Sequence, residues 1–211
     1  MTPDPHPWAC DLSQLYAEVW TRLTRGVHDR HAPARHPTLA TVTPDGRPQA
    51  RTVVLRAADK VAATLDIHTD LRSAKVGDLR VTPFAALHVW DTSAKLQVRL
   101  EAHVTILFGK DVDTIWEGVP AASRLSYGST PAPGQLIAQA LDYTQGSGAG
   151  SFVVLRLQLL TVDALHLGQS HRAPGSIATT NGQGHGWHPD SAANMRQARR
   201  VIHRGEEWVR R

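Results

Sequence analysis

Three windows between Gln49 and Val104 decide the fold of this chain: ARTVVLR (50–56), HTDLRSAK (68–75) and LQVRLEA (96–102). In these windows apolar residues alternate with polar and cationic ones, at the two-residue period of a half-buried strand. The polar residues repeatedly offer side chains that bind phosphate. We therefore interpret the stretch as the wall of an anion-binding β-barrel.

The stretch that begins at Leu96 alternates without a break for eleven residues, which predicts one long strand in a fixed register. One face carries Val98, Leu100, Ala102, Val104 and Ile106, and the other carries Gln97, Arg99, Glu101, His103 and Thr105.

The window ARTVVLR places a cation on each face of its strand. Arg51, Val53 and Leu55 share one face, and Thr52, Val54 and Arg56 share the other. On a strand such arginines ordinarily face solvent, and neither is expected to be fully buried without an anion. The nearby Thr69, Arg72 and Lys75 favour a functional interpretation.

Composition favours one soluble domain. The chain has 211 residues, of which 41% are hydrophobic, and a net charge of +4, with a pI near 9.6. No block of Lys and Arg precedes the last sixteen residues, so a small anionic ligand is favoured over nucleic acid. The single Cys10 fits a reducing compartment. No signal-peptide pattern or long apolar run is present, so we expect a cytoplasmic protein without membrane contact.

The first half of the chain predicts a mainly β fold with flanking helices. A helix is expected at about 11–25, capped by Asp11 and ended by Gly26. Asp45-Gly46 predicts a hairpin leading into ARTVVLR. Further strands are expected at VAATLDIHT (61–69), FAALHVWD (84–91) and KLQVRLEAHVTILF (95–108), and a short helix at AKVGDLR (74–80) after Ser73. Together these predict a meander of five or six antiparallel strands.

The second half predicts fewer strands. We expect a helix at 111–119, then a loop rich in Pro and Gly, and a helix at 135–143. One or two closing strands follow at 152–167. Residues 169–211 have few aliphatic residues and no clear period, which predicts an irregular tail after a single domain at 1–168.

The order of these motifs resembles the pyridoxamine 5′-phosphate oxidase-like family of FMN-binding split barrels. The resemblance is carried, in order, by ARTVVLR, HTDLRSAK, PFAALHVW, LQVRLEAHV and PAASRLSYGSTPAPGQLI, roughly from Pro37 to Leu167. The RSAK motif and the APG loop are more similar to the bacterial oxidase-related subgroup. The resemblance implies a six-stranded antiparallel split β-barrel of Greek-key type, a homodimer, and FMN as cofactor.

The resemblance also implies which residues bind FMN. They are Arg51, Thr52, Val53, Val54, His68, Thr69, Arg72, Ser73, Lys75 and Gln97. The family's basic pair that holds the phosphate falls on Ala74 and Lys75, so one cation is missing, and Arg72 is the candidate to replace it. In the family, the residue at Gln97 reaches the flavin from the other subunit of the dimer.

The implied activity is that of an FMN-dependent oxidoreductase, in which flavin N5 accepts a hydride from a small-molecule substrate. No side chain is assigned as a catalytic acid, base or nucleophile. Alternatives are a split barrel that binds deazaflavin or haem, one that binds FMN without turnover, and a basic nucleic-acid-binding barrel. The last lacks aromatics clustered between its cations. The twelve His residues show no zinc-binding spacing, so no metal is expected.

Several positions depart from the vitamin B6 oxidase itself. Aligned on Pro120 and Ser123, the Tyr and Arg that hold that enzyme's substrate phosphate are Ile115 and Val119 here. The corresponding Lys is Arg56, and the tail has no Arg-x-His. We therefore predict a substrate other than pyridoxamine 5′-phosphate, with Arg56 and Ser123 as substrate-binding candidates.

Overall fold

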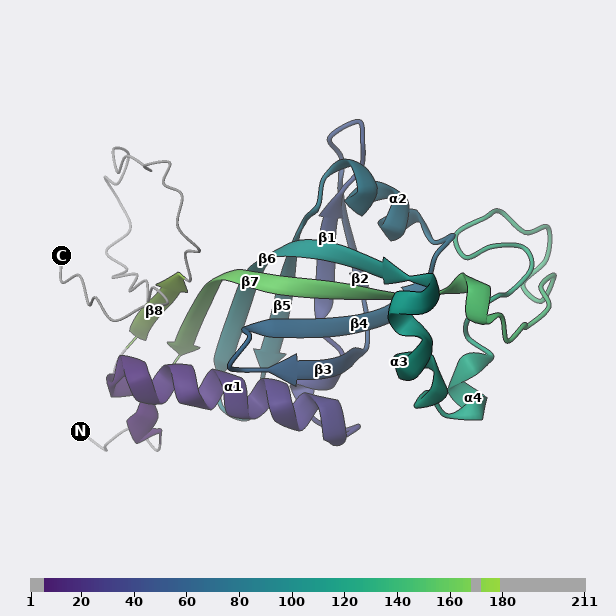
Figure 1. Ribbon diagram of the computed structural model, residues 1–211. Coiled ribbons are helices and arrows are strands. Elements are labelled where there is room, and N and C mark those ends of the chain that lie inside the picture. Colours follow the sequence, from purple (N-terminus) through teal and green to yellow (C-terminus); the bar gives the residue numbers. More distant parts are fainter. Residues whose placement is uncertain (1–5, 168–171, 179–211) are drawn as a thin grey trace.

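Eight strands form one antiparallel sheet in the computed structural model, which describes residues 6–167 and 172–178 (Figure 1). The strands are β1 (Thr38–Val42), β2 (Pro48–Thr52), β3 (Leu55–Asp59), β4 (Thr64–Asp70), β5 (Phe84–Asp91), β6 (Leu96–Phe108), β7 (Phe152–Leu167) and β8 (Arg172–Ala178). Seven follow the order β2-β1-β5-β6-β7-β4-β3, and β8 pairs with β7. The predicted fold class is confirmed, with more strands than the six expected.

The two ends of this strand order are consecutive in the chain. β2 pairs with β1 and β3 pairs with β4, yet only Val53 and Val54 separate β2 from β3. The sheet must therefore curl until its two edges meet, which produces a barrel split at this junction. ARTVVLR was predicted as one strand, and that prediction was wrong: the chain changes partner strand at the corner of the barrel.

The inner face of the sheet forms the main core. The alternation predicted from Leu96 is confirmed: positions from Leu96 to Val104 are alternately buried and open, although the register shifts between Glu101 and Ala102. Leu39, Leu87 and Leu155 from other strands are fully buried in the same core. The strands thus supply the apolar interior, and their polar residues are free to serve a site.

Helix α1 (Leu12–His28) lies against β3 along one side of the barrel (Figure 1). Asp11 caps it by accepting a hydrogen bond from the backbone N–H of Gln14 at 2.8 Å. The helix continues beyond Gly26, where it was predicted to end. A Cβ at Gly26 would lie 2.7 Å from the backbone of Ala34, so this glycine permits close packing inside the helix.

The remaining helices are short and lie near the ends of the strands. They are α2 (Ala74–Val81), α3 (Asp113–Glu117) and α4 (Ala121–Arg124), with 3-10 turns at Pro7–Cys10, Pro33–Arg35, Gly109–Val112 and Ala149–Ser151. Val112, Val119, Tyr127, Phe152 and Val154 form a second, smaller core. The helix predicted at 135–143 is absent from the described chain; Leu136 and Leu141 there are exposed, and so short a helix needs packing to persist.

The tail differs from its prediction in one segment. Arg172–Ala178 forms β8, pairing with Thr161–Leu167 of β7, although this segment was expected to be irregular. Pro174 and Gly175 are poor strand formers, so the strand depends on its partner. The rest of the predicted tail, 179–211, lies outside the described residues, and the domain boundary at 168 stays a prediction.

Within residues 6–167 and 172–178, the structure contains no helix that is both long and apolar enough to cross a membrane.

Candidate functional site

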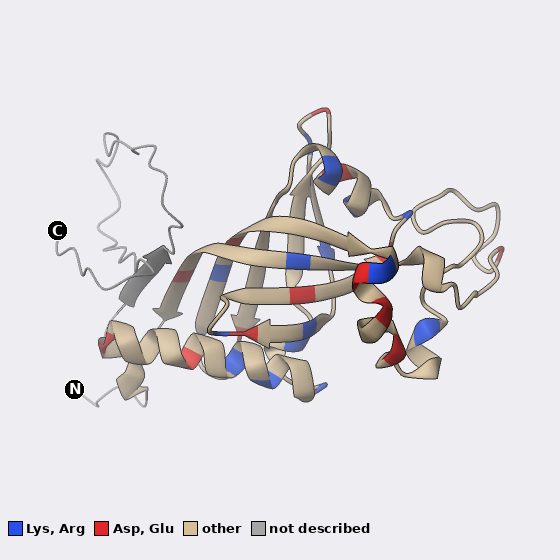
Figure 2. Cartoon of the chain, in the orientation of Figure 1, with Lys and Arg blue, Asp and Glu red and all other residues tan. Residues whose placement is uncertain are grey.

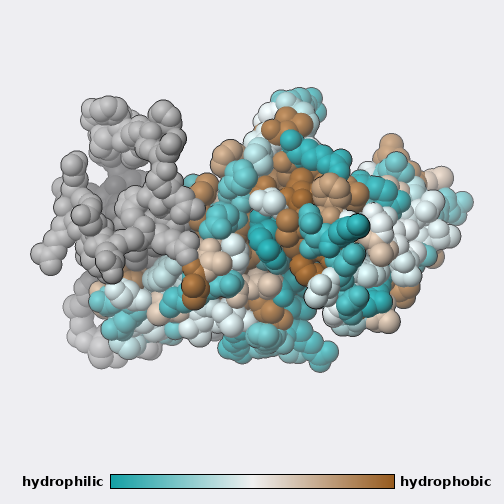
Figure 3. All heavy atoms as spheres, viewed as in Figure 1, coloured by the Kyte–Doolittle hydropathy of each residue, from teal (hydrophilic) through white to brown (hydrophobic). Residues whose placement is uncertain are grey.

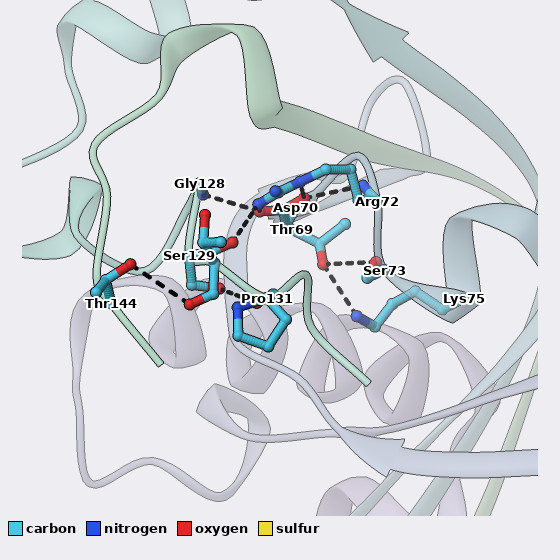
Figure 4. A network of polar contacts seen from close by, with 10 residues as sticks. Thr69, Asp70, Arg72, Ser73, Lys75, Gly128, Ser129, Pro131 and Thr144 are labelled. Carbon is cyan, nitrogen blue, oxygen red and sulfur yellow. Dashed lines mark hydrogen bonds and ion pairs between the residues drawn. The ribbon is translucent and has the colours of Figure 1, made fainter. Parts of the chain in front are cut away.

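Polar side chains converge where β4 ends and α2 begins (Figure 4). Lys75 Nζ donates to Thr69 Oγ1 at 3.0 Å. The hydroxyl of Ser73 lies 3.4 Å from that of Thr69, and Ser73 precedes α2 without capping it through its side chain. Three side chains of types that can hold a phosphate therefore meet at a helix N-terminus, and their role in binding stays a prediction.

Arg51 approaches the same group from β2. It lies opposite Leu39 in the β1–β2 register, so its side chain lies on the inner face. Burial lowers the pKa of Lys75, and the positive charge of Arg51 lowers it further. Burial also lowers the pKa of Arg51. The charge of Arg51 therefore acts on the half-buried Lys75, and Asp70 and Asp78 offset part of its effect.

This arrangement fits the phosphate of FMN. Partly desolvated cations are stabilised by an anion placed between them, and Thr69 and Ser73 add hydroxyl donors. Val53 and Val54 lie outside both neighbouring strands, beside the exposed Thr52. The residues present thus offer a charged end and a short apolar segment at the same barrel corner.

Arg72 is engaged by an acidic partner. It donates to Asp70 from Nε at 3.0 Å and from Nη2 at 2.7 Å, and Nη2 also donates to the carbonyl of Ser129 at 2.9 Å. Burial tends to raise the pKa of Asp70, but hydrogen bonds from Arg72 and Gly128 outweigh it and the pKa is lowered. Arg72 therefore anchors the loop that contains Ser129, and Asp70 already balances much of its charge.

His68 faces away from Thr69 and lies on the outer side of β4. Its ring meets that of Phe152 edge-on at 5.0 Å, next to the second core. Burial, with a smaller contribution from Arg56, lowers its pKa to about 4, so His68 is neutral at pH 7. Arg56 lies on the same outer side and hydrogen-bonds the buried Tyr127. The structure thus separates His68 and Arg56 from the cation cluster.

Gln97 lies far from the cation cluster of its own chain. It pairs with Leu165 on β7, whereas Thr69 pairs with Val153. These two β7 positions are twelve residues apart, which is roughly 40 Å in an extended strand. Gln97 also lies opposite Trp90 of β5, on the outer face of the sheet.

Ile115 and Val119, which stand at two substrate-binding positions of the oxidase, are packing residues in this chain. Val119 is buried in the second core, and Ile115 packs against it. Ser123 is half-buried in α4. The neighbouring Arg124 donates to the carbonyls of Val119, Trp116 and Glu117, so its role is to hold the turn between α3 and α4.

Two buried polar residues at the site were missed by the sequence analysis. Thr41 on β1 and Asp78 on α2 are hydrogen-bonded to each other and contact Arg51. A signal was present, because Thr41 follows Leu39 by two residues and so occupies an inward position normally taken by an apolar side chain.

Histidines and acids do not form a metal site in the described part of the chain, where no three such groups converge. His185 and His188 lie outside the described residues.

An antiparallel split barrel with a cation cluster at one strand end is the class of protein that the fold and site define. Residues 17–108 match the family model described as "Pyridoxamine 5'-phosphate oxidase, FMN-binding domain". Over this segment the chain is therefore similar to the pyridoxamine 5′-phosphate oxidase-like family, and the resemblance predicted from its motifs is confirmed.

Curated relatives carry the name pyridoxine/pyridoxamine 5′-phosphate oxidase. One from Gloeothece citriformis is 40% identical over 88 residues, covering 42% of this chain and 40% of the relative. A second from Arabidopsis thaliana is 28% identical over 182 residues, covering 78% of this chain and 91% of the relative. The chain spans about two fifths of the length of the first curated relatives it matches.

Solved structures share the fold. A pyridoxamine 5′-phosphate oxidase-related, FMN binding protein from Nostoc punctiforme has a TM-score of 0.63 at 23% identity, covering 85% of this chain and 93% of its own. PhzG from Burkholderia lata has a TM-score of 0.57 at 19% identity, covering 76% and 84%. At these identities the likeness establishes the fold alone.

Proposed function

We propose that this chain binds FMN, with the phosphate held by Arg51, Thr69, Ser73 and Lys75. The observation that carries the proposal is the pair of half-buried cations, in which the charge of Arg51 helps to lower the pKa of Lys75. A phosphate between them would relieve this repulsion. Deazaflavin and haem, the ligands of our alternatives, are also anionic, and the visible spectrum of the bound cofactor separates the three.

Each residue of the cluster has a distinct role in the proposed site. The guanidinium of Arg51 can hold two phosphate oxygens at once, while Lys75 supplies a point charge. Thr69 and Ser73 donate hydroxyl protons. Val53 and Val54, with Thr52, border the ring on the split between β2 and β3. His68 stays neutral beside Phe152 and supports the end of β4 from the outer side.

We further propose that the protein is an oxidoreductase for a small-molecule substrate other than pyridoxamine 5′-phosphate. FMN, when bound, supplies an acceptor for hydride at N5. The chain's own contribution is to bind and orient the cofactor and to exclude water from it. Arg56 and Ser123 are our candidates for contacting the substrate, and we assign no catalytic acid, base or nucleophile.

The proposed assembly is a cytoplasmic homodimer in which Gln97 enters the partner's site. Support comes from the outer face of β1 and β5, where Val42, Phe84 and Trp90 are exposed, the last two by 53% and 41%. Gln97 lies beside Trp90 on this face. Figure 3 shows further apolar side chains gathered below α2, the helix that ends at the exposed Val81. A second copy would cover such a surface.

Binding of nucleic acid is not part of the proposal. Figure 2 shows Lys and Arg spread over several elements of the described chain and interspersed with Asp and Glu. A nucleic-acid surface usually collects its cations on one face.

The visible absorption spectrum of protein purified without added cofactor tests the proposal. A flavin spectrum, and tight binding of FMN by the stripped protein, is the expected result. A deazaflavin or haem spectrum, with no affinity for FMN, would redirect the site to one of the alternatives. Binding without turnover of any reductant would leave a non-catalytic FMN-binding protein.

A further inference from the structure

A buried hydrogen-bond chain runs behind the cation cluster and ends on Arg51. Arg51 Nη1 donates to Thr41 Oγ1 at 2.6 Å, and Thr41 Oγ1 donates to Asp78 Oδ2 at 2.8 Å. Thr41 is 2% exposed and Asp78 is 5% exposed. Arg51 Nη2 also lies 3.7 Å from Asp78 Oδ2. Three elements, β2, β1 and α2, are thereby joined through one guanidinium.

The direction of this chain is fixed by counting protons. A hydroxyl has one proton and two lone pairs, and an ionised carboxylate can only accept. Asp78 therefore accepts the hydrogen bond of the Thr41 hydroxyl, and the Thr41 oxygen accepts one from Arg51. Arg51 therefore donates to an uncharged acceptor, the Thr41 hydroxyl. The carboxylate that balances its charge, that of Asp78, lies 3.7 Å away.

We propose that Thr41, oriented by Asp78, is a positioning residue that fixes Arg51 for anion binding without touching the ligand. The inference deepens the proposed phosphate site and rests on it. A free Arg side chain loses rotamer freedom when it binds a ligand, and a side chain already held in place loses less. The Nη1 end of the fork is committed to Thr41 and to the carbonyl of Leu39 at 3.5 Å.

The test measures binding of two probes by the full chain: FMN, by flavin fluorescence, and inorganic phosphate, by ³¹P NMR line broadening. Thr41→Val removes the hydroxyl at nearly constant volume and should weaken both probes about fivefold to tenfold. Thr41→Ser keeps the hydroxyl and should bind like wild type. Thr38→Val, on the opposite face of β1, is the matched control and should change nothing.

A merely structural role is separated by repeating the measurement without Arg51. In an Arg51→Met background, Thr41→Val should weaken neither probe further, because the residue it positions is gone. A loss of the same size in both backgrounds would overturn the inference. Thermal unfolding checks that each variant is folded, and Thr41→Cys, with a much weaker donor and acceptor, replaces Thr41→Val if that variant does not fold.

The two probes also separate failure of the inference from failure of the proposed function. Phosphate binding that depends on Thr41, in a protein that does not bind FMN, would uphold the inference and refute FMN as the ligand. Unchanged affinity of Thr41→Val for both probes would refute the inference and leave FMN binding in place. Wild-type protein that binds neither probe would overturn both.

Discussion

The carboxylate of Asp70 accepts a hydrogen bond at 2.8 Å from the backbone N–H of Gly128, a residue 58 positions further along the chain. The same carboxylate accepts a hydrogen bond from Arg72, and Arg72 also donates to the carbonyl of Ser129. The end of β4 and the start of the long loop before β7 are therefore fastened together directly beside Thr69.

Replacing Asp70 should loosen this loop. Asp70→Asn removes the charge that Arg72 is paired with, so we expect a loss of about 1–3 kcal/mol in the free energy of unfolding and faster proteolysis within 126–148. Limited proteolysis followed by mass spectrometry measures the effect. Asp142→Asn, at an exposed position in the same loop, is the control. Equal cleavage rates for both variants and wild type would mean that Asp70 does not hold the loop.

Lys75→Ala should weaken FMN binding by about 1.5–3 kcal/mol, the range for a hydrogen bond to a charged group. Titration of stripped protein with FMN measures the change. Lys110→Ala removes an equal charge at an exposed position far from α2 in the chain and should have little effect. Affinity that is unchanged in Lys75→Ala would remove Lys75 from the site.

Stability should fall in mild acid because of His68. Its pKa is about 4 in the folded protein, against an ordinary value of 6.5. Between these values the unfolded chain binds more protons, so the free energy of unfolding decreases as the pH falls, by about 2 kcal/mol from pH 7 to pH 5. Urea unfolding at several pH values measures this slope.

The substitution His68→Gln should flatten the slope between pH 7 and 5, because the titrating group is gone. His88→Gln, on the exposed face of β5, is the matched control. If wild type and His68→Gln lost stability equally over this range, another group would be responsible.

The protein should sediment as a homodimer at micromolar concentration, with twice the chain mass of 23.0 kDa. Trp90→Glu places a charge in the proposed interface and should shift the protein toward monomer and weaken FMN binding together, because Gln97 would leave the partner's site. Leu136→Glu introduces the same charge at an exposed loop position as a control. A monomeric wild type that still retains FMN would exclude the two-subunit site.

Turnover of pyridoxamine 5′-phosphate should be poor. By the resemblance, Ile115 and Val119 stand where the oxidase has the Tyr and Arg that hold its substrate phosphate. Each lost contact costs about 1.5–3 kcal/mol. Aerobic assays of FMN-loaded protein, followed as aldehyde formation, should give a catalytic efficiency below about 10⁴ M⁻¹s⁻¹. A value in the ordinary enzyme range would show that other residues bind the substrate phosphate.

Local sequence patterns predicted those parts of the fold that depend on local physics. The strand at Leu96 is evident because its period of two is unbroken, and Thr69, Ser73 and Lys75 could be grouped because they adjoin one strand end and one helix start. The break between β2 and β3 at Val53 cannot be found from the local sequence, because the residues on both sides of it have a strand pattern. It is imposed by the change of partner from β1 to β4.

Long-range contacts account for what the sequence did not reveal. Arg172–Ala178 has a weak strand pattern and is ordered by pairing with β7. Thr41 and Asp78 are 37 residues apart, and nothing in either neighbourhood indicates the other. The periodic stretch at 135–143 has no surface to pack on, so its helical pattern does not produce a helix.

The position of β7 in the sheet also sets the order in which the protein can fold during synthesis. β7 joins the β1–β2–β5–β6 group to the β3–β4 hairpin, and Asp70 must wait for Phe152, made 82 residues later. At about 5–20 residues per second a ribosome needs roughly 4–16 seconds to supply that strand, whereas a hairpin forms in about 1–10 μs. The nascent chain therefore carries a completed hairpin whose β4 edge is unpaired for seconds, and an unpaired strand edge is prone to aggregate.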